Sequence, residues 1–141
     1  MRRYLIVAHR TLAGEHLIDK VKECRSAGES EFHLVVPVQH PRDHPWSDGQ
    51  VEHAARQVLD AAVARFADEG IDVTGEVGDA NPVYAVGDVI LREIGRFDEI
   101  ILSTLPVGMS KWLAENMVRR LKRSTGLQVT HVIAEVASVR T

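Results

Sequence analysis

Tyr4-Leu5-Ile6-Val7-Ala8, the stretch YLIVA, is an unbroken run of apolar residues close to the start of the chain. A run this short cannot span a membrane, but its length is common for a β-strand. A strand with no polar side chain on either side is typical of a parallel sheet whose two faces are both covered by helices. YLIVA therefore predicts a buried strand in an α/β fold.

The rest of the chain continues the alternation of short apolar runs and longer amphipathic segments. Further strands are predicted at Phe32–Val38, Ile71–Val77, Asp98–Ser103 and Gln128–Ala134, and helices at Leu12–Ala27, Gln50–Asp68 and Ser110–Ser124. One more helix, the third in chain order, begins at Gly78–Pro82. Its apolar side is predicted to carry Val83, Val86, Val89, Ile90 and Ile94.

Strands that alternate with helices in this way predict a three-layer α/β sandwich, in which one five-stranded parallel sheet is covered on both faces. The strand orders 2-1-3-4-5 and 3-2-1-4-5 both satisfy the right-handed crossover rule, and the residue pattern does not choose between them. In either order a ligand binds beyond the carboxyl ends of the strands, at the point where the strand order reverses.

Length and composition indicate one globular domain, residues 1–141, with 45% hydrophobic and 26% charged residues. The formal net charge of −3 gives no general attraction to nucleic acid or to an acidic membrane, so we expect neither partner. The basic run Arg119–Arg123 falls late in a predicted helix, where cations complement the helix dipole, and we interpret it as a solvated face. Cys24, the one cysteine, is expected to be a buried thiol, and a cytoplasmic location is predicted.

The stretch IILSTLPVGMSKW, residues 100–112, lies at the expected binding end of the sheet. A strand runs here into hydroxyl residues, a proline and a glycine before a helix begins, and helix N-termini offer free N–H groups to phosphates. Three other loops are expected at the same end, at residues 9–11, 37–48 and 78–81. In the last of them, Asn81 or Asp79 is predicted to cap the third helix, with Pro82 in its first turn and Gly78 allowing the bend.

The order of these features resembles the universal stress protein family. The phrases that carry the resemblance are LIVAHR (5–10), EVGDANPVYAV (76–86), DEIILST (98–104) and GLQVTHVIAE (126–135), and it extends from Arg3 to about Glu135. The resemblance implies a Rossmann-like fold with the strand order 3-2-1-4-5 and a homodimer formed through the last strand. Members of that family that bind ATP carry an aspartate after the first strand and a Gly-x2-Gly-x9-Gly-Ser/Thr motif after the fourth.

This chain departs from that nucleotide motif at each position. Ser103 and Pro106 stand where the first two glycines belong, Asn116 and Met117 replace Gly-Ser/Thr, and Arg10 takes the place of the aspartate. Pro106 has no amide hydrogen to offer a phosphate, and Arg10 cannot accept a hydrogen bond from a ribose hydroxyl. We therefore expect no ATP binding in the family's usual mode, whereas an adenine nucleotide or another anion bound differently stays open as an alternative.

The candidate binding residues follow from the expected crevice and from the resemblance. Arg10 can pair with an anion, and Ser110 can present its hydroxyl at a helix start. The full set of candidates is His9, Arg10, Thr11, Val36, Asp79, Ser103, Thr104, Gly108 and Ser110. The sequence has no P-loop, no Gly-x-Ser-x-Gly elbow and no Ser-Gly-Gly-x-Asp-Ser stretch, so no catalytic residue is assigned.

The polar loop after the second strand contains the densest group of potential metal ligands, namely His40, Asp43, His44, Asp48 and His53. Two prolines, Pro41 and Pro45, disrupt any helix that would align His40 with His44, and no cysteine joins the set. We interpret the loop as exposed and assign no metal site. A flavodoxin-like electron carrier is disfavoured as well, because HRTLAGEH is too poor in hydroxyl residues for a flavin phosphate loop.

The last strand, Gln128–Ala134, would leave an exposed apolar edge in a monomer, and such edges are normally paired or covered. The sequence therefore predicts a UspA-like, non-catalytic homodimer with a regulatory or stress-response role. The alternative is a nucleotide- or anion-binding regulator that uses the crevice near Arg10 and Ser103–Ser110.

Overall fold

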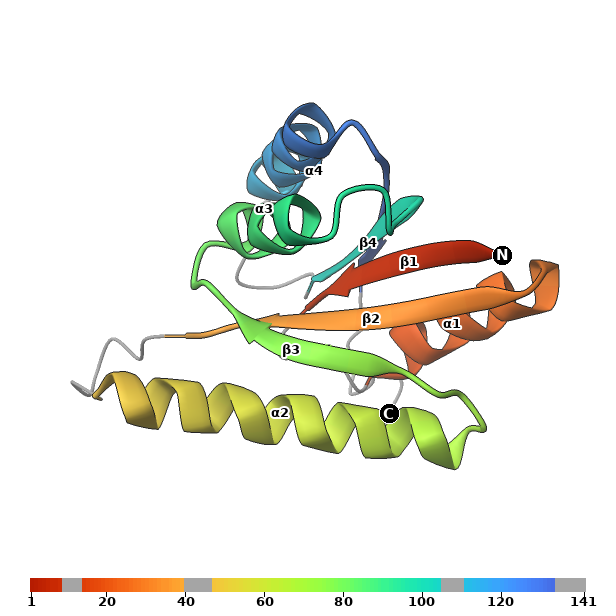
Figure 1. The fold of residues 1–141 in the computed structure, drawn as a ribbon, viewed down its shortest axis with the longest axis horizontal. Helices are drawn as coiled ribbons and strands as arrows, with labels where there is room; N and C mark the ends of the chain where they lie inside the picture. Colours follow the sequence, from red (N-terminus) through yellow and green to blue (C-terminus); the bar gives the residue numbers. More distant parts are fainter. Residues whose placement is uncertain (9–13, 40–46, 105–110, 134–141) are drawn as a thin grey trace.

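The computed structural model describes residues 1–8, 14–39, 47–104 and 111–133, with side chains in the last segment from residue 116 onward. Strands and helices alternate along the chain, as predicted (Figure 1). The strands are β1 (Arg2–Val7), β2 (Ser30–Pro37), β3 (Thr74–Gly78), β4 (Glu99–Thr104) and β5 (Gln128–Ile133). The helices are α1 (Glu15–Ala27), α2 (Asp48–Asp68), α3 (Pro82–Arg92) and α4 (Lys111–Thr125).

The five strands form one parallel sheet in the order β3-β2-β1-β4-β5. This confirms the predicted fold class and selects the order 3-2-1-4-5 from the two that the residue pattern allowed. The stretch YLIVA lies in the middle strand, where Ile6 pairs with Leu34 of β2 on one side and with Ile101 of β4 on the other. The order reverses between β1 and β4, which places the expected binding end at the carboxyl ends of these two strands.

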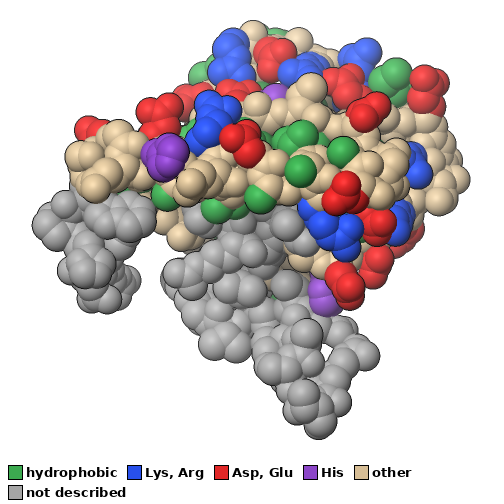
Figure 2. Space-filling model, turned by 90° about the horizontal axis from the view of Figure 1, so that it is seen from below, with side chains coloured by type: hydrophobic (Ala, Val, Ile, Leu, Met, Phe, Trp, Pro, Cys, Tyr) green, Lys and Arg blue, Asp and Glu red, His purple; other side chains and the backbone are tan. Residues whose placement is uncertain are grey.

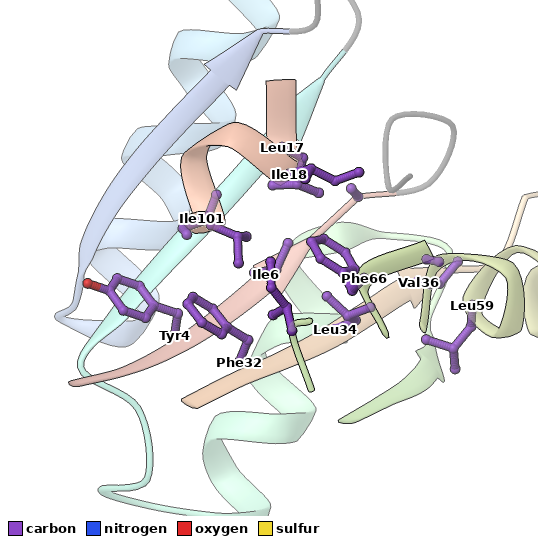
Figure 3. Close-up of a cluster of buried hydrophobic side chains, with 14 of the residues drawn as sticks. Tyr4, Ile6, Leu17, Ile18, Phe32, Leu34, Val36, Leu59, Phe66 and Ile101 are labelled. Atoms are coloured by element: carbon purple, nitrogen blue, oxygen red, sulfur yellow. The ribbon is translucent and has the colours of Figure 1, made fainter. Parts of the chain in front are cut away.

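Two apolar cores lie on the two faces of the sheet because successive strand side chains point to opposite sides. Tyr4, Ile6 and Ala8 of β1 belong to the first core, which packs against α1 and α2 (Figure 3). Leu5 and Val7 belong to the second core, which packs against α3 and α4. Helices α1 and α2 lie on the side of the sheet opposite α3 and α4 (Figure 1).

The helix starts show which capping predictions were right. Asn81 accepts a hydrogen bond from the backbone N–H of Val83 and caps α3, with Pro82 in the first turn, as predicted. Helix α1 was expected from Leu12 but begins at Glu15, because Gly14 has extended backbone angles and is its N-cap. Helix α2 begins two residues earlier than expected, since Ser47 and Gln50 form a reciprocal capping box.

Two further expectations are corrected. Ile94 was predicted on the apolar side of α3, but this helix ends at Arg92 and the Ile94 side chain is 82% exposed in the turn that follows. The third strand was predicted from Ile71 but begins at Thr74, although Ile71 is buried in the first core. Gly78, which was predicted to allow a bend, also has a packing role: a Cβ there would lie 2.9 Å from the Ala85 Cβ, so glycine lets α3 approach the end of β3 closely.

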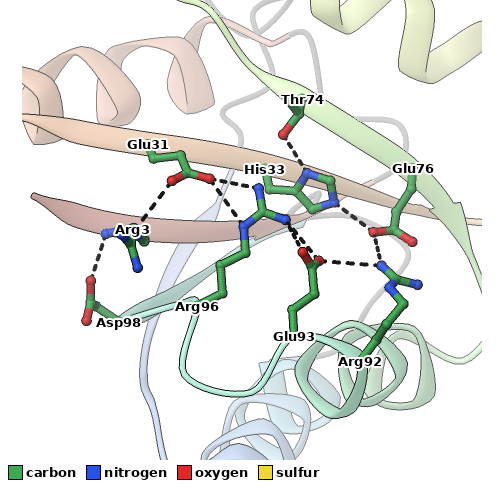
Figure 4. A network of polar contacts seen from close by, with 9 residues as sticks. All are labelled: Arg3, Glu31, His33, Thr74, Glu76, Arg92, Glu93, Arg96 and Asp98. Atoms are coloured by element: carbon green, nitrogen blue, oxygen red, sulfur yellow. Dashed lines mark hydrogen bonds and ion pairs between the residues drawn. The ribbon is translucent and has the colours of Figure 1, made fainter.

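A polar network at the amino-terminal side of the sheet connects β2 and β3 to α3 (Figure 4). The buried His33 ring contacts Thr74 Oγ1 through Nδ1 at 2.6 Å and Glu76 Oε1 through Nε2 at 2.7 Å. Glu76 also accepts a hydrogen bond from Arg92 Nη2 at 2.6 Å. A carboxylate only accepts, so Nε2 carries the proton and, in neutral His33, Nδ1 accepts from the Thr74 hydroxyl.

The same network fixes the turn between α3 and β4. Arg96 pairs with Glu31 of β2 at 2.7 Å and with Glu93 at 2.9 Å, and its guanidinium lies 4.8 Å from the Phe97 ring centroid. Asp98 accepts a hydrogen bond from the backbone N–H of Arg3 at 2.8 Å (Figure 4). These contacts anchor the turn to the first residues of the neighbouring strands, and so they set where β4 starts.

Glu76 makes the stability of this network sensitive to acid. Burial alone would raise its pKa, but hydrogen bonds from His33 and Arg92 outweigh that effect and hold the pKa below its ordinary value of 4.5. Such a carboxylate stabilises the fold above the unfolded-state pKa, and the contribution disappears as the pH falls through the lower folded-state pKa. Glu76→Gln is therefore expected to be less stable than the native chain at pH 7, with a difference that shrinks below about pH 4.5.

Urea unfolding followed by circular dichroism at several pH values measures this difference. Glu52→Gln, which removes a carboxylate from the exposed side of α2, is the matched control. Its free energy of unfolding, plotted against pH, should run parallel to that of the native chain. If the loss of unfolding free energy in Glu76→Gln stays constant from pH 7 to pH 3, the Glu76 contacts contribute no pH-dependent stability.

Candidate functional site

The candidate site lies where β1 and β4 end side by side. Val7 pairs with Leu102, and the residues that continue the two strands, Ala8, Ser103 and Thr104, are all buried. Residues 9–13 and 105–110 lie outside the described part of the chain. The candidates His9, Arg10, Thr11, Gly108 and Ser110, together with Pro106, fall in these two segments, so their roles stay predictions.

The hydroxyls of Ser103 and Thr104 lie on opposite faces of the sheet. Ile101 belongs to the first core and Leu102 to the second, and the alternation of a strand continues this pattern to the next two residues. Ser103 therefore lies on the face of α1 and α2, and Thr104 on the face of α3 and α4. The two hydroxyls cannot serve one ligand from the same side of the sheet.

Thr104 connects the candidate site to the edge strand β5. Its Oγ1 lies 2.7 Å from Nε2 of His131, which is half-buried on β5. Burial lowers the pKa of His131, which favours the neutral imidazole at neutral pH. Sequence reasoning placed His131 in the last strand but gave it no function. Its position beside Thr104 depends on the register between β4 and β5, in which Thr104 pairs with Ile133.

Two other candidates lie within the described residues. The Asp79 side chain is exposed and accepts a hydrogen bond from the backbone N–H of Asn81 at 2.8 Å, which shapes the turn before α3. The Val36 side chain is fully buried in the first core, where Leu59 and Ala55 of α2 also lie. The Met117 side chain packs against the second core, so the position aligned with the hydroxyl residue of the nucleotide motif carries a half-buried apolar group.

Strand β5 forms one edge of the sheet, and Ile133 at its end is 51% exposed. Glu99 of β4, whose carboxylate is buried, holds β5 in place. Glu99 Oε2 accepts a hydrogen bond from Thr130 Oγ1 at 2.6 Å, and Oε1 pairs with Arg2 Nη2 at 2.7 Å. An open cavity of about 290 Å³ lies between β5 and α1, lined by His16, Asp19, Lys20, Glu23, Thr130, His131 and Val132.

The prediction that Cys24 is a buried thiol is confirmed. Burial raises its pKa, which disfavours the reactive thiolate. Burial also raises the pKa of Tyr4, its neighbour in the first core, to about 12. Neither group is therefore ionised near neutral pH.

Within the described residues, no group of three or more histidine, cysteine, aspartate or glutamate side chains could hold a metal ion. His40, Asp43 and His44 of the polar loop lie outside this part of the chain, so the interpretation of that loop stays a prediction. No helix within the described ranges is long and apolar enough to cross a membrane.

The sequence matches no family model, and no curated protein sequence matches it significantly. Solved structures do match. A universal stress protein from Archaeoglobus fulgidus in complex with dAMP has a TM-score of 0.62 and 13% identity, and the match covers 94% of this chain and 97% of the other. A universal stress protein family protein from Arabidopsis thaliana with AMP bound has a TM-score of 0.62 and 10% identity, over 98% and 95% of the two chains.

A protein of the same family from Burkholderia pseudomallei has a TM-score of 0.59 and 18% identity, over 92% of this chain and 93% of its own. These matches show that the chain has the universal stress protein fold over nearly its whole length.

Proposed function

We propose that this chain is a UspA-like regulatory protein that acts as a non-catalytic homodimer, formed by pairing of β5 with β5 of a second copy. The observation that carries the proposal is that, within the described residues, β5 is an edge strand and ends in the half-exposed Ile133, in a chain with the universal stress protein fold. An unpaired edge strand presents backbone N–H and C=O groups to any other strand, and proteins normally cover or charge such edges.

The residues of β5 suit pairing with a second copy. The strand QVTHVI carries no Lys, Arg, Asp or Glu, the residues that discourage edge-to-edge contact. Ile133 is half-exposed at its end, and the Glu99–Thr130 hydrogen bond holds the strand against β4 from the inside. Strand β3, at the other edge of the sheet, is one residue shorter than β5 and carries the charged Glu76. The charge pattern therefore favours β5 over β3 as the dimer edge.

Ile133→Lys tests this pairing. A charge on each copy at the dimer edge is expected to raise the dimer dissociation constant at least about tenfold, because two lysines would face an apolar contact. Multi-angle light scattering across a micromolar dilution series measures the change. Leu91→Lys is the matched control, since Leu91 is an exposed apolar residue on α3, far from β5 in sequence. Equal dissociation constants for both variants would contradict pairing through β5.

A second function, binding of an adenine nucleotide or another anion, is supported by the fold relatives with dAMP and AMP bound. The proposed site is the carboxyl end of β1 and β4, with Arg10, Thr11, Ser103 and Ser110 as the residues that would contact the ligand. Thr104, which contacts His131 on the other face of the sheet, is not among them. Arg10 would supply the charge that pairs with a phosphate. The departures from the ATP motif make a mononucleotide or a simple anion the better candidate.

Differential scanning fluorimetry with AMP, ATP and inorganic phosphate tests this second function. A ligand at about 100 times its Kd stabilises a protein by about 2.7 kcal/mol, which gives a clear rise in Tm. We expect AMP to raise Tm more than ATP does, and Arg10→Ala to remove most of the rise. Lys20→Ala, on α1, is the control and should keep it. A Tm unchanged by all three compounds would refute the second function and leave the dimer proposal standing.

A further inference from the structure

Helix α3 is apolar on nearly every side. Only Asp88 and Arg92 among its 11 residues are charged, and a helix with this composition is normally buried all round. One side of α3 packs into the second core through Val83, Val86 and Val89. Its opposite side faces solvent.

That outer side and the turn that follows the helix carry three of the five large exposed apolar side chains of the described chain. The exposed fractions are 59% for Tyr84, 75% for Leu91 and 82% for Ile94, which lies in the turn after the helix. Tyr84 and Leu91 are seven residues apart, so they lie on the same side of α3 two turns apart. Gly87 lies between them, and a Cβ built there would meet nothing within 4 Å, which leaves room over the middle of the helix.

Helix α4 packs beside α3 and adds positive charge to this surface (Figure 1). Arg119, Arg120, Lys122 and Arg123 are all exposed, and none of them forms an ion pair with another described residue. Residues 116–127 contain no Asp or Glu. By contrast, acidic and basic side chains are interspersed on the face of the molecule shown in Figure 2.

We propose that this α3–α4 surface, defined by Tyr84, Leu91, Ile94, Arg119 and Arg123, docks an acidic amphipathic helix of another protein. The apolar side of that helix would cover Tyr84, Leu91 and Ile94, and its carboxylates would pair with the arginines of α4. A second copy of this chain is disfavoured as the occupant, because two such surfaces would bring like charges together. An anionic bilayer is the competing occupant, and the vesicle measurement in the test below distinguishes it from an acidic helix. The proposal does not depend on pairing through β5.

A synthetic peptide of about 18 residues, long enough to form a helix, serves as the probe. It carries Leu at helical i, i+3, i+4, i+7 spacing and Glu at most other positions. Two control peptides replace Glu by Lys or scramble the Leu positions. Titration into ¹⁵N-labelled protein, followed by backbone amide shifts, gives both the affinity and the location of binding. We expect the Glu peptide alone to bind, with shifts confined to residues 84–94 and 116–125.

Leu91→Lys, and separately the pair Arg119→Glu and Arg123→Glu, are expected to weaken binding at least tenfold, whereas Ile133→Lys on β5 leaves it unchanged. Each variant is first checked for an unchanged Tm, since all these side chains are exposed. Absence of binding, shifts elsewhere, or equal binding of the Lys peptide would overturn the proposal. So would sedimentation of the protein with phosphatidylserine vesicles when the Glu peptide causes no shifts, because that result assigns the surface to a membrane.

Discussion

Leu59→Ala is expected to lower the free energy of unfolding by about 3–5 kcal/mol, the upper part of the range for buried leucines. Leu59 on α2 is 2% exposed and lies in the first core, against β2 and β3. Its Cδ1 occupies the space that a Cβ of Gly75 would take, so a glycine lies directly beneath it. Because Gly75 has no side chain that could move into the space, the truncated residue leaves a cavity that cannot collapse easily.

Leu91→Ala is the matched control, since it makes the same chemical change on a helix at a position that is 75% exposed. An effect within about 0.5 kcal/mol is expected there. Urea unfolding followed by circular dichroism gives both values, with an unchanged denaturant slope as the check on two-state behaviour. Similar losses for the two variants would mean that α2 does not pack on the sheet as described.

Glu99→Ala is expected to lower the free energy of unfolding by about 2–3 kcal/mol. This loss is somewhat smaller than the roughly 3–5 kcal/mol that is typical when one partner of a buried ion pair is removed. The Glu99 side chain is 8% exposed, and its two oxygens bind Arg2 of β1 and Thr130 of β5. Truncation leaves the Thr130 hydroxyl without its acceptor and opens a space between three strands. The Arg2 side chain is 46% exposed, so water can solvate its guanidinium, which reduces the loss.

Glu23→Ala is the control for this variant, because the Glu23 side chain is 72% exposed and, among the described residues, pairs only with Lys20, at 3.4 Å. A surface pair of this kind contributes at most about 1 kcal/mol. Thermal and urea unfolding of both variants provide the comparison. A Glu99→Ala loss no larger than that of Glu23→Ala would show that Glu99 does not hold β1 and β5 to β4.

The fold could be predicted because its determinants are local. Unbroken apolar runs such as YLIVA occur where both faces of a strand are covered, and the alternation with amphipathic helices leaves few topologies. Asn81 followed by Pro82 specified the start of α3 for the same reason. Prediction failed where the structure depends on residues far away in the sequence. Ile94 continues the apolar pattern of α3, but the helix ends before it because contacts of Arg96 with a distant strand fix the turn.

The candidate site was less predictable because it depends on register and on side-chain direction. Ser103 and Thr104 are adjacent in sequence and were grouped in one crevice, yet strand alternation places them on opposite faces of the sheet. The contact between Thr104 and His131 requires the pairing of Thr104 with Ile133, and the residue pattern of two strands does not specify their relative shift. The buried contacts of His33 with Thr74 and Glu76 depend on register in the same way.

Native mass spectrometry of freshly purified protein at micromolar concentration tests the central claim, a homodimer with the universal stress protein fold, most directly. We expect a species of twice the 15.7 kDa chain mass, and we expect Ile133→Lys to lose this species on dilution sooner than Leu91→Lys does. Additional mass of a mononucleotide on the dimer would support the second function as well. A spectrum that contains only the single chain, unchanged by either substitution, would contradict the homodimer.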